Sequence, residues 1–298
     1  MQNTRKFPLI LSSFWLKVIA LFTMTIDHIG YNLEGNFTYD WLPDLANAFR
    51  IIGRIALPLF CFMIAEGAMR TKNFNKYALR LGIMASIISV ALIGAEYIPG
   101  IGSMRSQGII FVDLLLGAVS IYCLRQKKWY FKILAVLPLL YGIASFVATS
   151  LENCGCHGNI LWFPFFMRTQ YGWYAILLCI LFYFANIFAK IFISYLSGLT
   201  GINVENYQDS DIERHAINII SVLMLIGASF LLYLCGTMMP SKYVSWMINI
   251  QLYAMLAGAF ILLYNGRRGY NKKWFQYGSY LYYPVHMIAI YLIAMLFM

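Results

Sequence analysis

The chain has 298 residues, of which 61% are hydrophobic, 17% aromatic and only 11% charged, and its mean hydropathy is +0.69. This composition excludes an ordinary water-soluble domain and indicates a chain whose solvent is mostly lipid. The net charge of +10 is spread over short loops with no compact basic domain, as membrane orientation requires, so it does not indicate a nucleic-acid partner.

Nine apolar stretches have the roughly 17–25 residues needed to cross about 30 Å of hydrocarbon. We expect spans at 14–33, 51–69, 78–98, 108–124, 132–151, 171–193, 216–236, 246–265 and 276–298. No internal repeat or low-complexity tract divides them, so the sequence predicts one membrane domain over 1–298, an all-α, polytopic bundle of transmembrane helices. The first span lacks a small-residue cleavage site and carries its own charges, so we expect it to be retained.

Lysine and arginine in the loops predict the orientation, because these residues stay on the cytoplasmic side of short loops. With the N-terminus in the cytoplasm, most of the 22 lysines and arginines fall in cytoplasmic loops. Those expected on the outer side are Arg105, Arg168 and Lys242. The sequence therefore predicts a multi-pass membrane protein with a cytoplasmic N-terminus.

The first predicted span contains three ionisable residues, Lys17, Asp27 and His28. Ionisable groups in hydrocarbon are costly and commonly mark a functional site. Asp27 and His28 lie about two thirds of the way through the span, too deep to reach either surface easily, and they suit proton exchange. Lys17 precedes His28 by 11 residues, which at ~100° per residue places both within about 20° on one helix face. This stripe predicts an enzyme or a transporter.

The second predicted span adds Arg50 and Arg54, one helical turn apart at its outer end, and Glu66 near its inner end. Because this span runs from outside to inside, both arginines reach the depth of Asp27 from the other direction. We therefore expect Arg54 to pair with Asp27. A Lys17–Glu66 ion pair is the simplest structural account of the two inner charges, and a purely structural role for the deeper set stays open.

Two further polar residues lie in later spans. His286 lies about halfway along the last span, one turn after Tyr282, and it either packs against a neighbouring helix or contributes to the site. Asp113 lies in the outer half of the fourth span, where we expect it to form an ion pair with Arg50 or Arg54.

A predicted outer loop contains Cys154, Cys156 and His157. These are three metal-ligating residue types, but no partner pair lies at the spacing of a zinc site, so we predict no metal centre. A disulfide from this loop to another outer thiol, for instance Cys235, is the alternative if the outside is oxidising.

Several of these residues lie in motifs that resemble the TraX family. The motifs are Leu16-Lys17-Val18-Ile19-Ala20, Met24-Thr25-Ile26-Asp27-His28-Ile29-Gly30, Gly53-Arg54-Ile55-Ala56-Leu57-Pro58-Leu59-Phe60-Cys61-Phe62, Ala65-Glu66-Gly67, Arg70-Thr71-Lys72-Asn73, residues 77–81, Leu263-Tyr264-Asn265-Gly266-Arg267-Arg268-Gly269 and Tyr282-Tyr283-Pro284-Val285-His286. The similarity covers the first ~90 residues and the last ~45. Between them, the chain matches only as generic membrane helices.

The resemblance implies membrane-embedded acyl transfer, typified by acetylation of the N-terminal amine of pilin subunits, with acetyl-CoA as the donor. More distantly, the chain is similar to membrane acyltransferases that acetylate sugars beyond a bilayer. The resemblance therefore implies a bacterial cytoplasmic membrane protein whose acceptor is a peptide or a cell-envelope glycan. The matched polar positions are Lys17, Asp27, His28, Arg54, Glu66, Arg70, Arg80 and His286.

Acyl transfer needs a base for the incoming amine or hydroxyl and positive charge for the developing oxyanion. His28 is the expected base, and Arg54 supplies positive charge or fixes the acceptor. Asp27 either orients a histidine, such as His286, or holds an arginine. The phosphates of the CoA donor are expected to meet cytoplasmic cations, with the pantetheine arm reaching toward His28. These cations are Arg70, Lys72, Lys76, Arg80 and Lys17.

Two other classes of function stay open. A proton-coupled transporter or flippase of an anionic molecule uses the same intramembrane residue types, although the odd number of spans and the lack of a repeat disfavour it. An assembly factor without enzymatic activity would instead use an aromatic outer loop, residues 161–166, to bind an exported polypeptide. That loop is more typical of an aromatic belt at the membrane interface.

Overall fold

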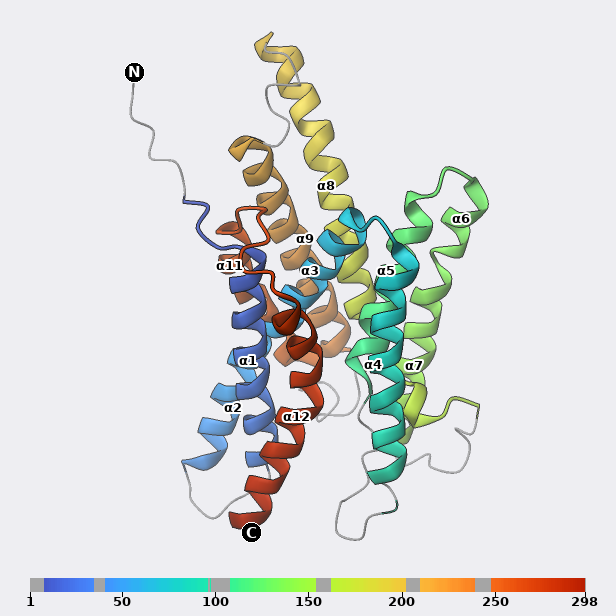
Figure 1. Ribbon diagram of the computed structural model, residues 1–298, viewed down its shortest axis with the longest axis vertical. Helices are drawn as coiled ribbons and strands as arrows, with labels where there is room; N and C mark the ends of the chain where they lie inside the picture. The colour runs from blue at the N-terminus through green and yellow to red at the C-terminus, as the bar shows by residue number, and fades with distance from the viewer. Residues whose placement is uncertain are drawn as a thin grey trace. The chain divides into compact units, whose positions relative to one another are not determined.

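The computed structural model describes residues 8–34, 41–95, 97, 108–153, 162–201, 210–238 and 248–297 (Figure 1). Their helices are α1 (Ser13–Leu33), α2 (Leu42–Gly53), α3 (Ala56–Arg70), α4 (Phe74–Ala95), α5 (Ile110–Arg125), α6 (Trp129–Leu134), α7 (Leu137–Asn153), α8 (Trp173–Thr200), α9 (Asp211–Thr237), α11 (Gly258–Leu262) and α12 (Lys273–Phe297), with 3-10 helices η1 (Phe165–Met167) and η3 (Ile250–Ala257). These residues contain no β-strand. They contain one isolated β-bridge, between Leu11 and Tyr264. The predicted all-α class is confirmed.

Five segments of the described chain are long and apolar enough to cross a membrane. They are Leu42–Arg70, Phe74–Gly94, Trp129–Glu152, Trp173–Leu199 and Asp211–Thr237. Each overlaps a predicted span, so the chain is a membrane protein with several spanning helices. The full count of nine spans and the cytoplasmic N-terminus stay predictions.

Two predicted spans take a different form in the structure. Within the predicted span 51–69, α2 and α3 are separated by a turn at Arg54 and Ile55. Pro58 explains the break, because its ring clashes with the carbonyl of residue 54 and it lacks the N–H that would bond there. The stretch 246–265 contains η3 and α11, and its apolar helical part, Ile250–Leu262, is shorter than a full span.

The chain divides into two compact units, 1–60 with 184–298 and 61–183. In the first unit, α1 lies beside both α2 and α12, and η3 and α11 pack against α9 (Figure 1). Glycines allow α1 and α2 to approach closely. A Cβ added to Gly30 would lie 2.8 Å from Cβ of Phe49, and one added to Gly53 would lie 2.6 Å from Cγ of Asp27. This close packing brings the polar residues of the two helices together.

The variant Gly53→Ala should therefore disturb the packing at Asp27 and lower the free energy of unfolding by about 1–3 kcal/mol, the usual cost of overpacking. Thermal unfolding in detergent micelles measures the effect. Gly227→Ala is the matched control, because a Cβ at Gly227 meets no atom within 4 Å. An equal melting temperature for the two variants would contradict this account of the α1–α2 contact.

The second unit contains α4 to α7 and η1, with most of α3 and the start of α8. Asp113 of α5 is fully buried, and its carboxylate accepts hydrogen bonds from the backbone N–H groups of Gln170 (2.7 Å) and Tyr171 (3.2 Å). It therefore fixes the segment that leads into α8. The pairing of Asp113 with Arg50 or Arg54 stays a prediction.

Candidate active site

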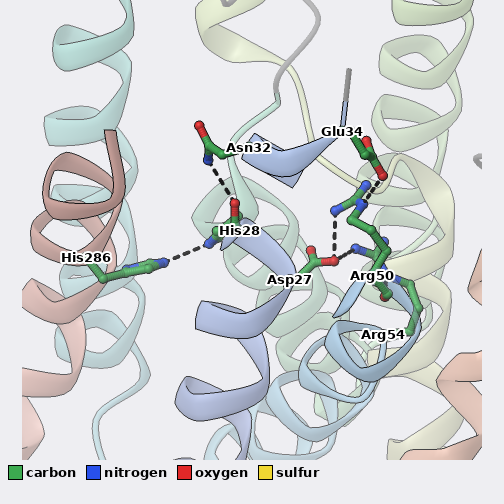
Figure 2. Close-up of polar contacts among 7 residues, drawn as sticks. All are labelled: Asp27, His28, Asn32, Glu34, Arg50, Arg54 and His286. Carbon is green, nitrogen blue, oxygen red and sulfur yellow. Dashed lines mark hydrogen bonds and ion pairs between the residues drawn. The ribbon is translucent and has the colours of Figure 1, made fainter. Parts of the chain in front are cut away.

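Asp27 of α1 holds two arginines from the α2 side of the first unit (Figure 2). Nη1 of Arg50 lies 2.8 Å from Oδ1 of Asp27, and Nη2 of Arg54 bonds the same oxygen. Nε of Arg54 also donates to the carbonyl oxygen of Arg50 at 3.1 Å. All three side chains are buried. The predicted Asp27–Arg54 pair is confirmed, and Arg50 joins it.

Glu34, just beyond the end of α1, completes this cluster, although it lies outside the motifs singled out in the sequence. Nε of Arg50 donates to Oε1 of Glu34 at 2.9 Å. Burial raises the pKa of the Glu34 carboxyl, and the guanidinium of Arg50 acts in the opposite direction. Glu34 follows Asp27 by seven residues, which places both on one helix face, so this spacing could have identified it. Two carboxylates thus balance two guanidinium groups.

His28 faces the other side of α1 and meets His286 of α12 (Figure 2). Nδ1 of His28 lies 2.7 Å from Nε2 of His286, and both side chains are buried. Nδ1 of His286 lies 2.8 Å from the carbonyl oxygen of Tyr282, whose ring stacks on the His286 ring. The Tyr282 hydroxyl in turn lies 2.7 Å from Oγ1 of Thr25 on α1. The His286 ring is therefore held by Tyr282, and it positions the His28 ring through their shared hydrogen bond.

These bonds determine which nitrogens carry protons when both rings are neutral. A carbonyl oxygen only accepts, so Nδ1 of His286 carries a proton and donates to Tyr282. Nε2 of His286 then has the lone pair and accepts from Nδ1 of His28. The second nitrogen of His28, Nε2, is left unprotonated. His28 can therefore act as a base through Nε2, with His286 as its orienting partner.

The geometry also separates the two roles that the sequence leaves open for Asp27. Neighbouring helix residues point ~100° apart, and Asp27 and His28 lie on opposite sides of α1 in Figure 2. Asp27 holds Arg50 and Arg54, and it is His28 that contacts His286.

The predicted donor-binding cations lie in both units. In the first, Lys17 is partly buried, with Nζ 5.7 Å from the centroid of the Phe275 ring. In the second, Nη2 of Arg70 lies 2.7 Å from Oε2 of Glu66, one turn earlier on α3. The remaining three are exposed, on α4 or in the turn before it: Lys72, Lys76 and Arg80. The Lys17–Glu66 ion pair stays a prediction.

Among the described residues, no group of three or more His, Cys, Asp or Glu side chains could hold a metal ion. Cys154, Cys156 and His157 lie outside those residues, so the structure does not test the predictions for their loop.

Of the aromatic loop 161–166, the structure describes the residues from Trp162 onward. The hydroxyl of Ser89 on α4 donates to the carbonyl oxygen of Phe166 at 2.8 Å.

The chain is 39% identical over 72 residues to the probable fimbrial assembly protein FimC, serogroup H1, of Dichelobacter nodosus, which covers 24% of this chain and 27% of that protein. It is 24% identical over 276 residues to the uncharacterized protein RP591 of Rickettsia prowazekii (strain Madrid E), which covers 87% of this chain and 95% of that one. No solved structure matches significantly.

The family model described as TraX protein matches residues 12–199, more than half of the chain. The match includes α1, α2 and the basic loop before α4, and it ends before α12 with His286. It also extends through the middle of the chain, beyond the motifs from which the resemblance was inferred. The chain therefore belongs to the TraX family.

Proposed function

We propose that this protein is an integral-membrane acetyltransferase that moves an acetyl group from cytosolic acetyl-CoA to an amine or hydroxyl. The observation that carries the proposal is the buried His28–His286 pair, with Nε2 of His28 left as a free base. Family membership supports it, because TraX proteins are associated with pilin acetylation. The name of the FimC relative refers to fimbrial assembly, which favours a pilin-like polypeptide over a cell-envelope glycan as the acceptor.

In the proposed reaction, the neutral amine or the hydroxyl of the acceptor attacks the acetyl carbonyl while His28 Nε2 takes its proton. A C–N or C–O bond forms, the C–S bond of the thioester breaks, and the proton passes to the departing sulfur. His286 accepts the hydrogen bond from His28 Nδ1 and so keeps the ring oriented while it is positively charged. Arg54 lies on the other side of α1 from His28, where it would orient a more distant part of the acceptor or add positive charge at long range, although Asp27 offsets part of that charge.

The donor phosphates would meet the cations at the end of α3 and in the loop and helix that follow it. Arg70, Lys72, Lys76 and Arg80 occur there within 11 residues, and Lys17 is the further candidate in the first unit. Under this proposal, the loop between α3 and α4 faces the cytoplasm of a bacterium, and the nine predicted spans cross its cytoplasmic membrane.

The direct test uses the purified protein in nanodiscs with radiolabelled acetyl-CoA and a peptide that begins with a pilin-type N-terminal amine. We expect labelled peptide and a matching release of free CoA thiol. The same peptide with a blocked N-terminus, and a glycan fragment, decide between the two acceptor classes. Label transfer to none of these acceptors, together with counterflow of an anion into vesicles that contain the protein but no acetyl-CoA, would contradict the proposal and favour a transporter.

A further inference from the structure

The second unit contains a cavity of about 400 Å³ where the end of α3, the start of α4 and the end of α5 meet. This volume lies within the ~300–1,000 Å³ that is typical of small-molecule sites. Two cations, Lys72 and Arg125, and two aromatic rings, Phe74 and Tyr122, line it. Both loops that form it, one after α3 and one after α5, are predicted to be cytoplasmic. The cavity therefore lies where a cytosolic ligand would enter.

Local hydrogen bonds fix the walls of this cavity. Nη1 of Arg125 donates to the carbonyl oxygen of Ala68 at 2.6 Å, which ties the end of α5 to the end of α3. The side-chain oxygen of Asn73 accepts from the backbone N–H of Lys76 at 3.0 Å and so satisfies one free donor in the first turn of α4. A site whose walls are already held in place loses little conformational entropy when it binds a ligand.

The charge of the lining favours an anion. The lining residues include two cations, three side-chain amides and no carboxylate. The amides, which can donate to phosphate oxygens, belong to Asn73, Asn75 and Gln126. The cavity also adjoins the N-terminus of α4, a helix of 22 residues whose dipole adds positive potential there.

The aromatic lining favours a planar group beside that anion. The rings of Phe74 and Tyr122 are stacked, with centroids 4.2 Å apart and planes at 16°. Such flat aromatic surfaces bind nucleobases by stacking in many proteins, and the stacking tolerates any base. A ligand that fits both features carries phosphate groups and a nucleobase.

We propose that this cavity binds the phosphorylated adenosine end of the acyl donor, with Lys72 and Arg125 on the phosphates and the Phe74–Tyr122 pair against the base. The identification of the ligand as CoA rests on the proposed function, whereas the preference for a phosphorylated nucleotide rests on the cavity alone. Tyr122, Arg125 and Gln126 lie outside the motifs singled out in the sequence.

Binding of CoA, dephospho-CoA, adenosine 3′,5′-bisphosphate and inorganic pyrophosphate to the full-length protein in nanodiscs tests the proposal. We expect saturable binding of CoA and the bisphosphate. The dissociation constants should rise at least about tenfold in both Lys72→Gln and Arg125→Gln, since each removes a charged phosphate contact. Lys127→Gln is the matched control, because it removes a nearby exposed cation that does not line the cavity. Tyr122→Leu should weaken the bisphosphate about threefold or more and leave pyrophosphate unchanged.

Two outcomes would overturn the site. One is binding that changes equally in Lys72→Gln and Lys127→Gln. The other is pyrophosphate binding as tight as that of the nucleotides with no effect of Tyr122→Leu, which would indicate a simple phosphate or lipid-headgroup site. Binding that follows the expected pattern, in a protein that transfers no acetyl group, would support the nucleotide site and contradict the proposed reaction. Acetyl transfer at the wild-type rate in the cavity variants would support the proposed reaction and contradict the nucleotide site.

Discussion

Replacing Asp27 with alanine is expected to lower the free energy of unfolding by about 3–5 kcal/mol, the cost of leaving buried charges without their partner. Two guanidinium groups, those of Arg50 and Arg54, depend on this one carboxylate oxygen. Arg50 retains Glu34 after the change, but the ion pair of Arg54 with Asp27 is lost. Reversible unfolding in mixed micelles, followed by helical circular dichroism, measures the difference.

Glu34→Gln is the matched control for this prediction. Among the described residues, the ion pair of Glu34 is with Arg50, and 28% of its side chain is exposed to solvent, so its loss should cost less than about 1 kcal/mol. A cost for Asp27→Ala no greater than that for Glu34→Gln would show that the cluster does not hold α1 and α2 together.

Replacing His28 with alanine is expected to lower the rate of acetyl transfer by about 10²–10⁴-fold, the usual contribution of a positioned general base. The variant removes Nε2, the only ring nitrogen of the histidine pair that the bonding pattern leaves free to accept a proton. Initial rates at saturating acetyl-CoA measure the loss, and the melting temperature shows that the variant is folded. His215→Ala, which removes a histidine of α9, should retain the wild-type rate.

The partner position distinguishes an orienting role from simple packing. His286→Gln keeps an oxygen that can accept from Nδ1 of His28, whereas His286→Leu does not. We therefore expect kcat to fall about tenfold more in the leucine variant, with KM unchanged in both. Equal rates in the two variants at equal stability would show that His286 only fills space.

The sequence predicted the ion pair at Asp27 better than the contacts of the histidines. Depth along two antiparallel spans was sufficient to pair Asp27 with Arg54, because depth follows from residue number alone. Adjacent helix residues point ~100° apart, so Asp27 and His28 face different partners. Which helix lies on which side of α1 depends on tertiary packing. The sequence therefore kept His286 as a possible partner of Asp27, whereas in the structure His286 contacts His28.

The start of α2 shows what local signals can add. The helix begins at Leu42, well before the predicted span at 51, with Pro43 and Asp44 in its first turn. Proline and acidic residues at that position are typical of a helix start, but hydropathy alone does not weigh them. The cavity could not be predicted in this way. Lys72 and Arg125 lie 53 residues apart in the sequence. They line one cavity because the ends of α3 and α5 and the start of α4 meet there.

¹⁵N NMR of protein labelled with [¹⁵N]histidine shows whether His28 presents an unprotonated Nε2 that is held in place by His286. The chain has four histidines, so His28→Gln and His286→Gln assign both rings. At neutral pH, we expect Nδ1 to be protonated in both rings, and Nε2 of His28 to have the chemical shift of an unprotonated nitrogen and no coupling to a proton. A proton on Nε2 of neutral His28 would contradict this assignment.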